Sequence, residues 1–371
     1  QQGKKVTIIE REQFPRFSIG ESLLPQCMAY IEQAGMLQDV VEAGFQYKNG
    51  AAFRRGDTYT DFDFRDKWSP GWGTTYQVQR ADFDHVLAKA AEKAGAEIRY
   101  QHTVLNADVS GERPSLTVRN PQDEEYQISG RYLLDASGFG RTLPKLLQLE
   151  TPSDFPTRGA IFTHIEDHID PTLLPQDGGF DRNKILITVH PEHCHVWFWL
   201  IPFSNGRCSL GVVAELPYLE QFQGLQVGEH TSRLQAIVAQ TPTLATLLKN
   251  AMWDTPARTI TGYAANVTSL WGKNFALLGN AGEFLDPVFS SGVTIAMTSA
   301  HLASACIARA DAGETVDWET DYAIPLKKGV DTFRTFVRSW YDGRFQDVIF
   351  YPDKQAEITR MIAAILAGYA W

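Results

Sequence analysis

Apolar and polar residues alternate along the chain in patterns that predict both strands and helices. Residues 3–10 (GKKVTIIE) form a β-branched run that ends on an acidic residue, which is typical of the second strand of a dinucleotide-binding unit. Residues 23–36 and 81–94 have apolar positions at roughly helical spacing, with Ser22 as a candidate helix cap, and residues 48–79 alternate as short strands do. This order of elements predicts a mixed α/β fold.

The second half of the chain begins rich in predicted strands and ends in predicted helices. Residues 156–215 hold several apolar runs that favour an antiparallel sheet, and helices are predicted over 227–252, 293–308 and 331–367. We predict an α/β protein with a Rossmann-like domain and an inserted, mostly antiparallel sheet domain. The first is assigned to 1–45, 80–150 and 270–310, the second to 46–79 and 151–269, and a C-terminal helical region to 311–371.

The position of the first strand predicts that part of the Rossmann-like domain is absent. In such a domain a GxGxxG turn precedes the acidic strand end by about 20 residues, but here only nine residues precede Glu10. We therefore expect the first strand, the phosphate loop and the first helix to be missing, and a dinucleotide to bind poorly without them. The alternative is that residues 3–10 are an ordinary buried strand.

Composition and charge narrow the class of protein. Of the 371 residues, 44% are hydrophobic and 21% charged, which is typical of a globular protein. The longest apolar run, residues 361–371, falls short of the roughly 18 residues of a membrane span. The net charge of −10 and the scattered basic residues argue against nucleic acid as a partner. The 4 cysteines form no CxxC pair, so we expect reduced, buried thiols and a cytoplasmic protein.

Three separated segments have the pattern of strand ends that meet one cofactor. The first ends at Glu10, whose carboxylate can accept hydrogen bonds from ribose hydroxyls. The second is YLLDASGFG at residues 132–140, and the third is LLGNAGEFLDPVFSSGVTIA at residues 277–296, where a helix begins near Gly292. A helix N-terminus offers unpaired N–H groups to an anionic ligand atom. Each segment alone is more often a simple turn, but their order and spacing together predict a nucleotide-type site.

These segments resemble the flavoprotein monooxygenase superfamily with the para-hydroxybenzoate hydroxylase fold, and within it the flavin-dependent halogenases of the phenol and pyrrole type. The resemblance spans nearly the whole chain. Two motifs narrow the resemblance to halogenases: WFWLIP at Trp197–Pro202 fits the pattern WxWxIP, and KNGAAF at residues 48–53 fits KxGxxF. The superfamily motifs are VTIIERE at 6–12, FSIGESLLP at 17–25, QVQRADFD at 77–84, DASG at 135–138 and GNAGEFLDPVFSSGV at 279–293.

The resemblance implies roles for particular residues. Lys48 matches the catalytic lysine, Ser291 and Gly292 the halide-binding positions, and Trp197, Trp199 and Pro202 a barrier between flavin and substrate. The expected cofactor is FAD, and the positions implied to bind it are Glu10, Gly20, Glu21, Ser22, Arg80, Val104, Asp135, Gly138, Gly279, Asn280, Pro287, Gly292 and Val293.

The resemblance also implies a reaction and its partners. A separate flavin reductase supplies reduced flavin, and oxygen with chloride or bromide then yields hypohalous acid. The substrate is an electron-rich aromatic compound, a phenol or pyrrole, either free or tethered to a carrier protein. The alternatives are an FAD-dependent aromatic monooxygenase or dehydrogenase, and a flavoprotein that binds its cofactor without turnover.

The chain departs from the family pattern at three places. Asn280 stands where members usually have aspartate, and Arg55-Gly56 replaces a common tryptophan-glycine pair. Phe289 occupies the position of a glutamate in tryptophan halogenases, so free tryptophan is not the expected substrate.

Each of these positions also has an ordinary structural interpretation. A lone lysine such as Lys48 is usually solvated, and two tryptophans on one strand face are usually core residues. Residues 333, 336, 337 and 340 have the spacing of a packed helix face, with a lid as the alternative. His190, His193 and His195 lack the companion ligands of a metal site, so no metal is assigned.

Overall fold

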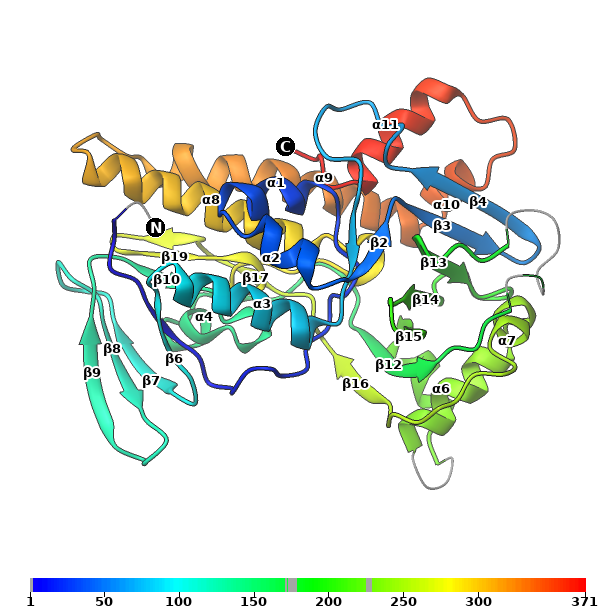
Figure 1. Cartoon of the computed structure of the whole chain (residues 1–371), viewed down its shortest axis with the longest axis horizontal. Coiled ribbons are helices and arrows are strands. Elements are labelled where there is room, and N and C mark those ends of the chain that lie inside the picture. Colours follow the sequence, from blue (N-terminus) through cyan, green and yellow to red (C-terminus); the bar gives the residue numbers. More distant parts are fainter. Residues whose placement is uncertain (1–2, 171, 173–178, 225–228) are drawn as a thin grey trace.

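The structure is a computed structural model that describes residues 3–170, 172, 179–224 and 229–371. It has an α/β architecture, which confirms the predicted fold class (Figure 1). Several small sheets lie on one side of the molecule, a large sheet lies on the other, and long helices run along the top.

The large sheet has seven strands in the order β16-β12-β15-β14-β13-β3-β4. Neighbouring strands are antiparallel except β13 and β3, which are parallel. The strands β3 and β4 from the first part of the chain therefore extend a sheet that residues 158–261 otherwise build. Its strands are β3 (Gly50–Arg55), β4 (Thr58–Asp63), β12 (Arg158–Glu166), β13 (Lys184–Val189), β14 (Trp197–Pro202), β15 (Arg207–Glu215) and β16 (Arg258–Thr261).

The remaining strands form smaller sheets. β10 and β19 are parallel neighbours, so their carboxyl ends, Asp135 and Leu277, lie at the same edge. β1 pairs in parallel with β6, and β7, β8 and β9 form an antiparallel sheet. The bounds are β1 (Thr7–Ile9), β2 (Gln46–Lys48), β5 (Thr75–Gln77), β6 (Glu97–Arg99), β7 (Thr103–Asp108), β8 (Ser115–Arg119), β9 (Glu125–Ser129), β10 (Leu133–Asp135), β11 (Glu150–Thr151), β17 (Asn266–Val267), β18 (Trp271–Gly272) and β19 (Phe275–Leu277).

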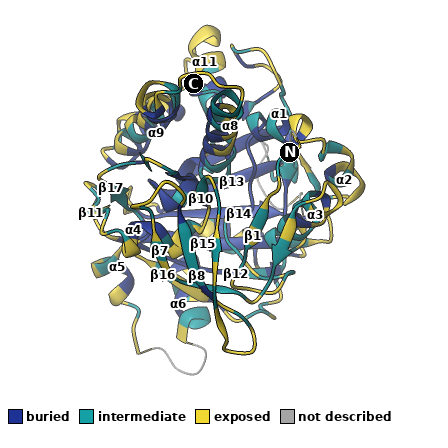
Figure 2. Cartoon of the chain, turned by 90° about the vertical axis from the view of Figure 1, so that its left-hand side faces the viewer, coloured by how far each residue is buried: buried dark blue, intermediate teal, exposed yellow. Residues whose placement is uncertain are grey.

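The longest helices, α8 and α9, lie together at the top of the molecule, with α1 beside α8 (Figure 2). No helix in the described ranges is long and apolar enough to cross a lipid bilayer. The α-helices are α1 (Gln26–Gln33), α2 (Leu37–Glu42), α3 (Arg80–Lys93), α4 (Thr142–Leu146), α5 (Leu216–Glu220), α6 (Glu229–Ala239), α7 (Pro242–Leu247), α8 (Gly292–Asp311), α9 (Ile324–Tyr341), α10 (Arg344–Ile349) and α11 (Ala356–Leu366). Short turns of other helix types are η1 (Gly138–Gly140), η3 (Gly279–Ala281), η4 (Pro287–Phe289) and η5 (Glu319–Ala323).

Strand β14 divides the core into two layers. Because alternate residues of a strand face opposite sides, Trp197, Trp199 and Ile201 pack toward the C-terminal helices, while Phe198 and Leu200 pack toward α6 and α7. The aromatic side chains predicted for one face of α9 lie in the first layer, where Phe333 and Trp340 are fully buried.

Two local expectations are wrong. Ser22 does not cap a helix: it pairs with Gln77 in an isolated β-bridge, and α1 begins three residues after Leu23, directly behind Pro25. Proline has no backbone N–H that would be left unpaired at a helix start, so Pro25 is compatible with a helix that begins at the next residue. All 4 cysteines are free as expected, but Cys194 is exposed rather than buried.

Candidate functional site

Lys48 is buried rather than solvated. It ends β2, and its side chain is 1% exposed. Its Nζ donates hydrogen bonds to Ser22 Oγ and to the Leu23 carbonyl, both at 2.7 Å, and lies 5.4 Å from the centre of the Phe64 ring. Among the described residues this buried amine has two neutral hydrogen-bond acceptors and no carboxylate partner, which is unusual for a structural lysine. The surface interpretation of Lys48 therefore does not hold.

The surroundings of Lys48 change its protonation. Burial disfavours the charged form and lowers the pKa of the Lys48 ammonium to about 7, against an opposing, smaller effect of Cys27. Near neutral pH the group thus exchanges between ammonium and free amine. The ammonium form can donate a hydrogen bond, and the free amine can act as a nucleophile.

The low pKa predicts how stability depends on pH. In the unfolded chain Lys48 keeps its proton up to about pH 10, whereas in the folded protein it loses the proton near pH 7. The folded state therefore binds fewer protons above pH 7, and stability rises with pH over this window. Wild type should gain free energy of unfolding relative to Lys48→Met between pH 7 and pH 9, measured by urea unfolding. A constant difference across this range would contradict the buried, titrating lysine.

The N-terminus of α8 gathers several of the predicted cofactor residues. Gly20 has a φ of +99°, and a Cβ there would lie 3.0 Å from Arg80 Nη1 and 3.9 Å from Val293 Cγ2. Arg80 also donates to the Ile19 carbonyl at 2.8 Å, and Asp84 holds its guanidinium in place. The glycine turn, the arginine and the first turn of α8 are therefore neighbours. Ser291 and Gly292 begin this helix, and its first N–H groups have no side-chain cap.

The turn after β19 lies beside the same helix. A Cβ on Gly279, whose φ is +51°, would lie 2.7 Å from Ala296 Cβ, so only glycine lets the strand end approach α8 this closely. Asn280 Oδ1 is buried and has no hydrogen-bond partner among the described residues, and it lies 3.7 Å from where a Gly292 Cβ would be. An unsatisfied buried acceptor is costly. It is suited to a hydroxyl of a bound ligand.

Other predicted cofactor residues have different roles or positions. The Asp135 carboxylate accepts the backbone N–H groups of Ser137 and Leu143 at 2.8 and 2.7 Å, so it holds the turn that contains Gly138. Glu10 follows β1, and Val104 lies on β7, in sheets separate from β10 and β19. Glu10 Oε1 accepts the N–H of Glu12 at 2.7 Å.

Glu21 has a partner that the sequence does not indicate. Its fully buried carboxylate bonds through Oε1 to His164 Nε2 at 2.6 Å, while Oε2 has no partner among the described residues. His164 lies on β12, 143 residues along the chain, and no spacing pattern connects the two. The pair links the glycine turn to the large sheet.

The two tryptophans of β14 stand side by side. Their ring centres are 6.1 Å apart, and both side chains are buried. Trp199 Nε1 donates to Ser209 Oγ at 3.0 Å, and a Cβ on Gly211 would lie 2.3 Å from the Trp199 ring. Trp197 Nε1 donates to Tyr341 Oη at 2.9 Å. Pro202 ends the strand opposite Cys208. The indoles are thus fixed core groups that form a continuous wall.

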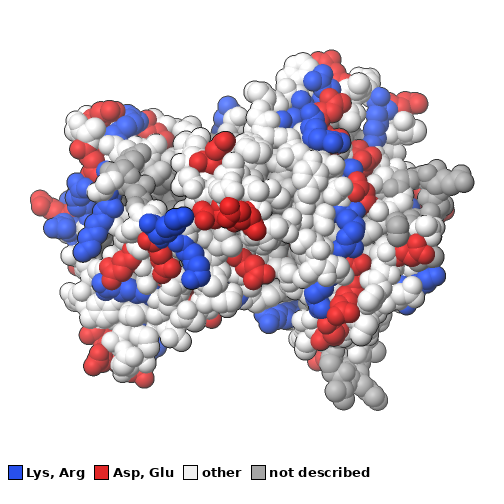
Figure 3. Space-filling model, in the orientation of Figure 1, with Lys and Arg blue, Asp and Glu red and all other residues white. Residues whose placement is uncertain are grey.

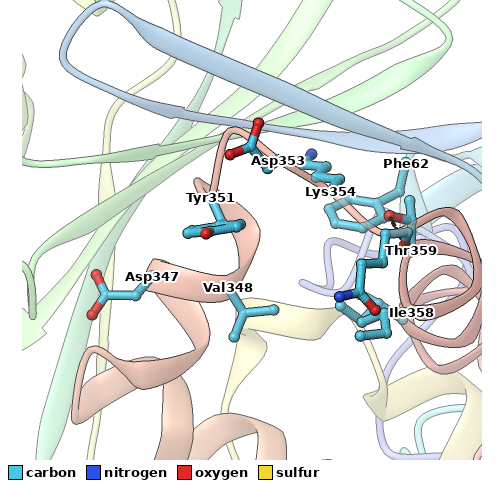
Figure 4. Close-up of a pocket in the computed structure, with 10 residues that line it drawn as sticks. Phe62, Asp347, Val348, Tyr351, Asp353, Lys354, Ile358 and Thr359 are labelled. Atoms are coloured by element: carbon cyan, nitrogen blue, oxygen red, sulfur yellow. Dashed lines mark hydrogen bonds between the residues drawn. The ribbon is translucent and has the colours of Figure 1, made fainter.

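A groove of about 350 Å³ opens between β4 and the helices α10 and α11 (Figure 4). Phe62 lies at its buried end, whereas Val348, Tyr351 and Ile358 are exposed along it. Phe62 lies on β4, and Phe64 follows directly after the end of this strand. Both side chains belong to one core cluster, and two residues of extended chain span about 7 Å. Phe64 covers the Lys48 ammonium, but neither Phe64 nor Lys48 is among the described residues that line the groove.

The histidine group does not assemble a metal site. His190 bonds through Nε2 to Gln240 Oε1 at 3.0 Å, and its ring lies 5.0 Å from that of His193. Within the described ranges no group of three potential ligands could hold a metal ion.

On the face shown in Figure 3, Lys and Arg are interspersed with Asp and Glu.

Comparison with known proteins now identifies the family. Residues 65–370 match the sequence profile described as tryptophan halogenase. The chain belongs to this family. It is 30% identical over 363 residues to the flavin-dependent halogenase gsfI of Penicillium aethiopicum, covering 91% of this chain and 66% of that one. The resemblance to flavin-dependent halogenases inferred from the sequence is therefore confirmed.

Two further relatives show the range of the family. A 1H-pyrrole-2-carbonyl-[peptidyl-carrier protein] chlorinase of Pseudomonas fluorescens is 26% identical, covering 91% of this chain and 78% of that protein. A solved flavoprotein/dehydrogenase of Cytophaga hutchinsonii is 40% identical with a TM-score of 0.93, covering 100% of this chain and 88% of that one. The chain spans 58% to 66% of the length of the first three curated relatives it matches.

Proposed function

We propose that the protein is an FAD-dependent halogenase of electron-rich aromatic compounds. The observation that carries the proposal is Lys48, a buried amine whose pKa is lowered to about 7 and which bears no carboxylate partner. A lysine kept partly neutral in an apolar site is prepared for chemistry rather than for a surface ion pair. Its position in KxGxxF matches the lysine that the halogenase resemblance assigns to catalysis.

The residues around α8 fit an FAD. Asn280 Oδ1, which has no partner among the described residues, would accept a hydrogen bond from a ribityl hydroxyl, Gly20 and Gly279 would allow close approach, and Arg80 braces the glycine turn. Pro287 and Val293 flank the helix start. Glu10, Val104 and the Asp135–Gly138 turn are assigned to the adenosine and pyrophosphate side. When bound, the reduced flavin would supply two electrons to O2, and the oxygen thus reduced to the peroxide level would take two electrons from the halide.

Residues of the protein bind the halide and direct the oxidised halogen to the substrate. The N–H groups of Ser291 and Gly292 at the start of α8, a helix N-terminus without a side-chain cap, would hold chloride or bromide. The wall of Trp197 and Trp199 keeps the aromatic substrate away from the flavin, and Pro202 ends the strand that carries this wall. Lys48 receives the oxidised halogen and directs it to the ring, either as a hydrogen-bond donor or as an amine that carries the halogen.

The groove beside Phe62 suits the approach of the substrate. Its volume of about 350 Å³ is that of a site for a small aromatic molecule, and its outer end is open, which leaves room for a carrier-tethered substrate as well as a free one. Phe62, at its buried end, belongs to the same core cluster as Phe64, whose ring covers Lys48. A separate flavin reductase completes the proposed system.

Filling the groove should weaken substrate binding without affecting the chemistry. Val348→Trp places an indole on the exposed α10 side of the groove, and we expect the KM for 2-naphthol to rise about tenfold, or about 1.4 kcal/mol, with kcat nearly unchanged. Val41→Trp, an equally exposed position on α2, is the matched control. If the two variants have the same KM, the groove is not the route of the substrate.

The proposal is tested by turnover with defined components. The protein is incubated with FAD, a flavin reductase, NADH, oxygen and bromide, together with phenols and pyrroles both free and carrier-bound. Products are identified by mass. We expect bromide-dependent brominated products from at least one member of the panel, and flavin oxidation without any halogenated product across the panel would overturn the assignment.

A further inference from the structure

A buried hydrogen-bond chain connects three distant parts of the molecule. Trp197 Nε1 donates to Tyr341 Oη at 2.9 Å, and Tyr341 Oη donates to Asp286 Oδ2 at 2.9 Å. The other carboxylate oxygen, Asp286 Oδ1, accepts the N–H of Val288 at 3.0 Å. The side chains of Trp197, Tyr341 and Asp286 are all buried, and Asp286 is 2% exposed.

A tyrosine hydroxyl is suited to this bridge. The indole of Trp197 is solely a donor and an ionised Asp286 is solely an acceptor, so the group between them must accept and donate at once. The Arg158 guanidinium lies over the face of the Tyr341 ring, 3.4 Å from its centre. Burial raises the pKa of Asp286 to about 6, and burial also raises the pKa of Tyr341, so near neutral pH the phenol keeps its proton.

The bridge lies between the two parts of the proposed site. Trp197 belongs to the wall on β14, and Asp286 caps η4, the turn that leads through Ser291 into α8. Tyr341 is the last residue of α9. A displaced Tyr341 hydroxyl would therefore release the indole on one side and the turn before the helix start on the other.

We infer that Tyr341 is a positioning residue that fixes the Trp197 indole relative to the turn entering α8. This inference rests on the proposed function, in which the wall and the helix start work together. With both held by one hydroxyl, the oxidised halogen passes to the Lys48 side instead of escaping to water. Loss of the bridge uncouples flavin oxidation from halogenation. The residues of the β14 wall and those of the turn entering α8 are still present, but the hydroxyl no longer connects them.

Tyr341→Phe tests this inference against a matched control. Tyr322 is equally buried, and its hydroxyl donates to the Leu277 carbonyl at 2.6 Å, so Tyr322→Phe also removes one buried hydrogen bond. We expect the halogenated product per reduced flavin consumed to fall at least fivefold in Tyr341→Phe and less than twofold in Tyr322→Phe, with similar losses of thermal stability. Equal product ratios in the two variants would reduce Tyr341 to a purely structural role and overturn the inference.

A second measurement separates this inference from the proposed function. The indole ¹⁵N–¹H signal of Trp197, assigned by its absence in Trp197→Phe, should shift in Tyr341→Phe and stay in place in Tyr322→Phe. An unchanged signal in Tyr341→Phe shows that the bridge does not exist in solution and overturns the inference whatever the enzyme makes. If wild type yields no halogenated product, the proposed function fails, and with it the coupling role of Tyr341, even where the signal shifts.

Discussion

Replacing Lys48 by alanine or methionine is expected to lower the rate of halogenated product formation at least about a hundredfold, the low end of the loss on removing a positioned acid–base group. The buried amine has two acceptors and no charge partner, so its removal leaves no unpaired carboxylate behind. Oxidation of reduced flavin should be nearly unchanged, because Lys48 contacts the cofactor segment only through Ser22 Oγ and the Leu23 carbonyl among the described residues, and not through Asn280 or Gly279. Product formation and flavin oxidation are measured in the same reaction.

A second lysine provides the control for this result. Lys67 is also buried, donates to the Gly71 carbonyl at 2.8 Å and lies 5.0 Å from the Tyr369 ring, so its contacts resemble those of Lys48. Lys67→Met should keep product formation within about twofold. Near-normal product from Lys48→Met would return Lys48 to a structural role.

Removing the Trp199 indole should change both stability and the product. The cavity left by Trp199→Ala is expected to lower the free energy of unfolding by about 3–5 kcal/mol. The opened wall should also let a phenol reach the flavin side, so that an oxygenated product appears in the absence of halide. Phe198→Ala on the opposite face of β14 is the control, since it removes a buried ring without opening the wall.

The wall makes a separate prediction through Gly211. A Cβ there would lie 2.3 Å from the Trp199 ring, so Gly211→Ala in wild type should cost about 1–3 kcal/mol of stability from overpacking. In the Trp199→Ala background the added methyl enters the vacated space, and the same change should cost little or stabilise. Additive effects in this double-mutant cycle would show that the two side chains are not in contact.

Elements with a local pattern could be predicted from the sequence. The apolar runs that end at Asp135 and Gly279 indicated neighbouring strand ends, and β10 and β19 do lie side by side. The two-residue period at Trp197 and Trp199 correctly placed both rings on one face. These features could be predicted because the periodicity of a strand or helix appears in residues that are close together in the sequence.

Contacts between distant segments could not be predicted in this way. Ser22 was expected to cap a helix, yet its hydroxyl accepts from Lys48, 26 residues away. The Glu21–His164 pair and the hydrogen bond from Tyr341 to Asp286 join residues 143 and 55 positions apart. Such contacts depend on how elements pack and leave no repeating signal in one sequence. The burial of Lys48 belongs to the same class, since only packing shows that Phe64 covers it.

The central claim is tested most directly by turnover of a phenol or pyrrole substrate by wild type with and without bromide, with reduced FAD and oxygen present in both reactions. We expect a brominated product, recognised by its bromine isotope doublet, when bromide is present. When bromide is omitted, we expect the substrate to remain unchanged. An oxygenated or dehydrogenated product that forms equally well without halide would contradict the central claim and identify the protein as a monooxygenase or dehydrogenase.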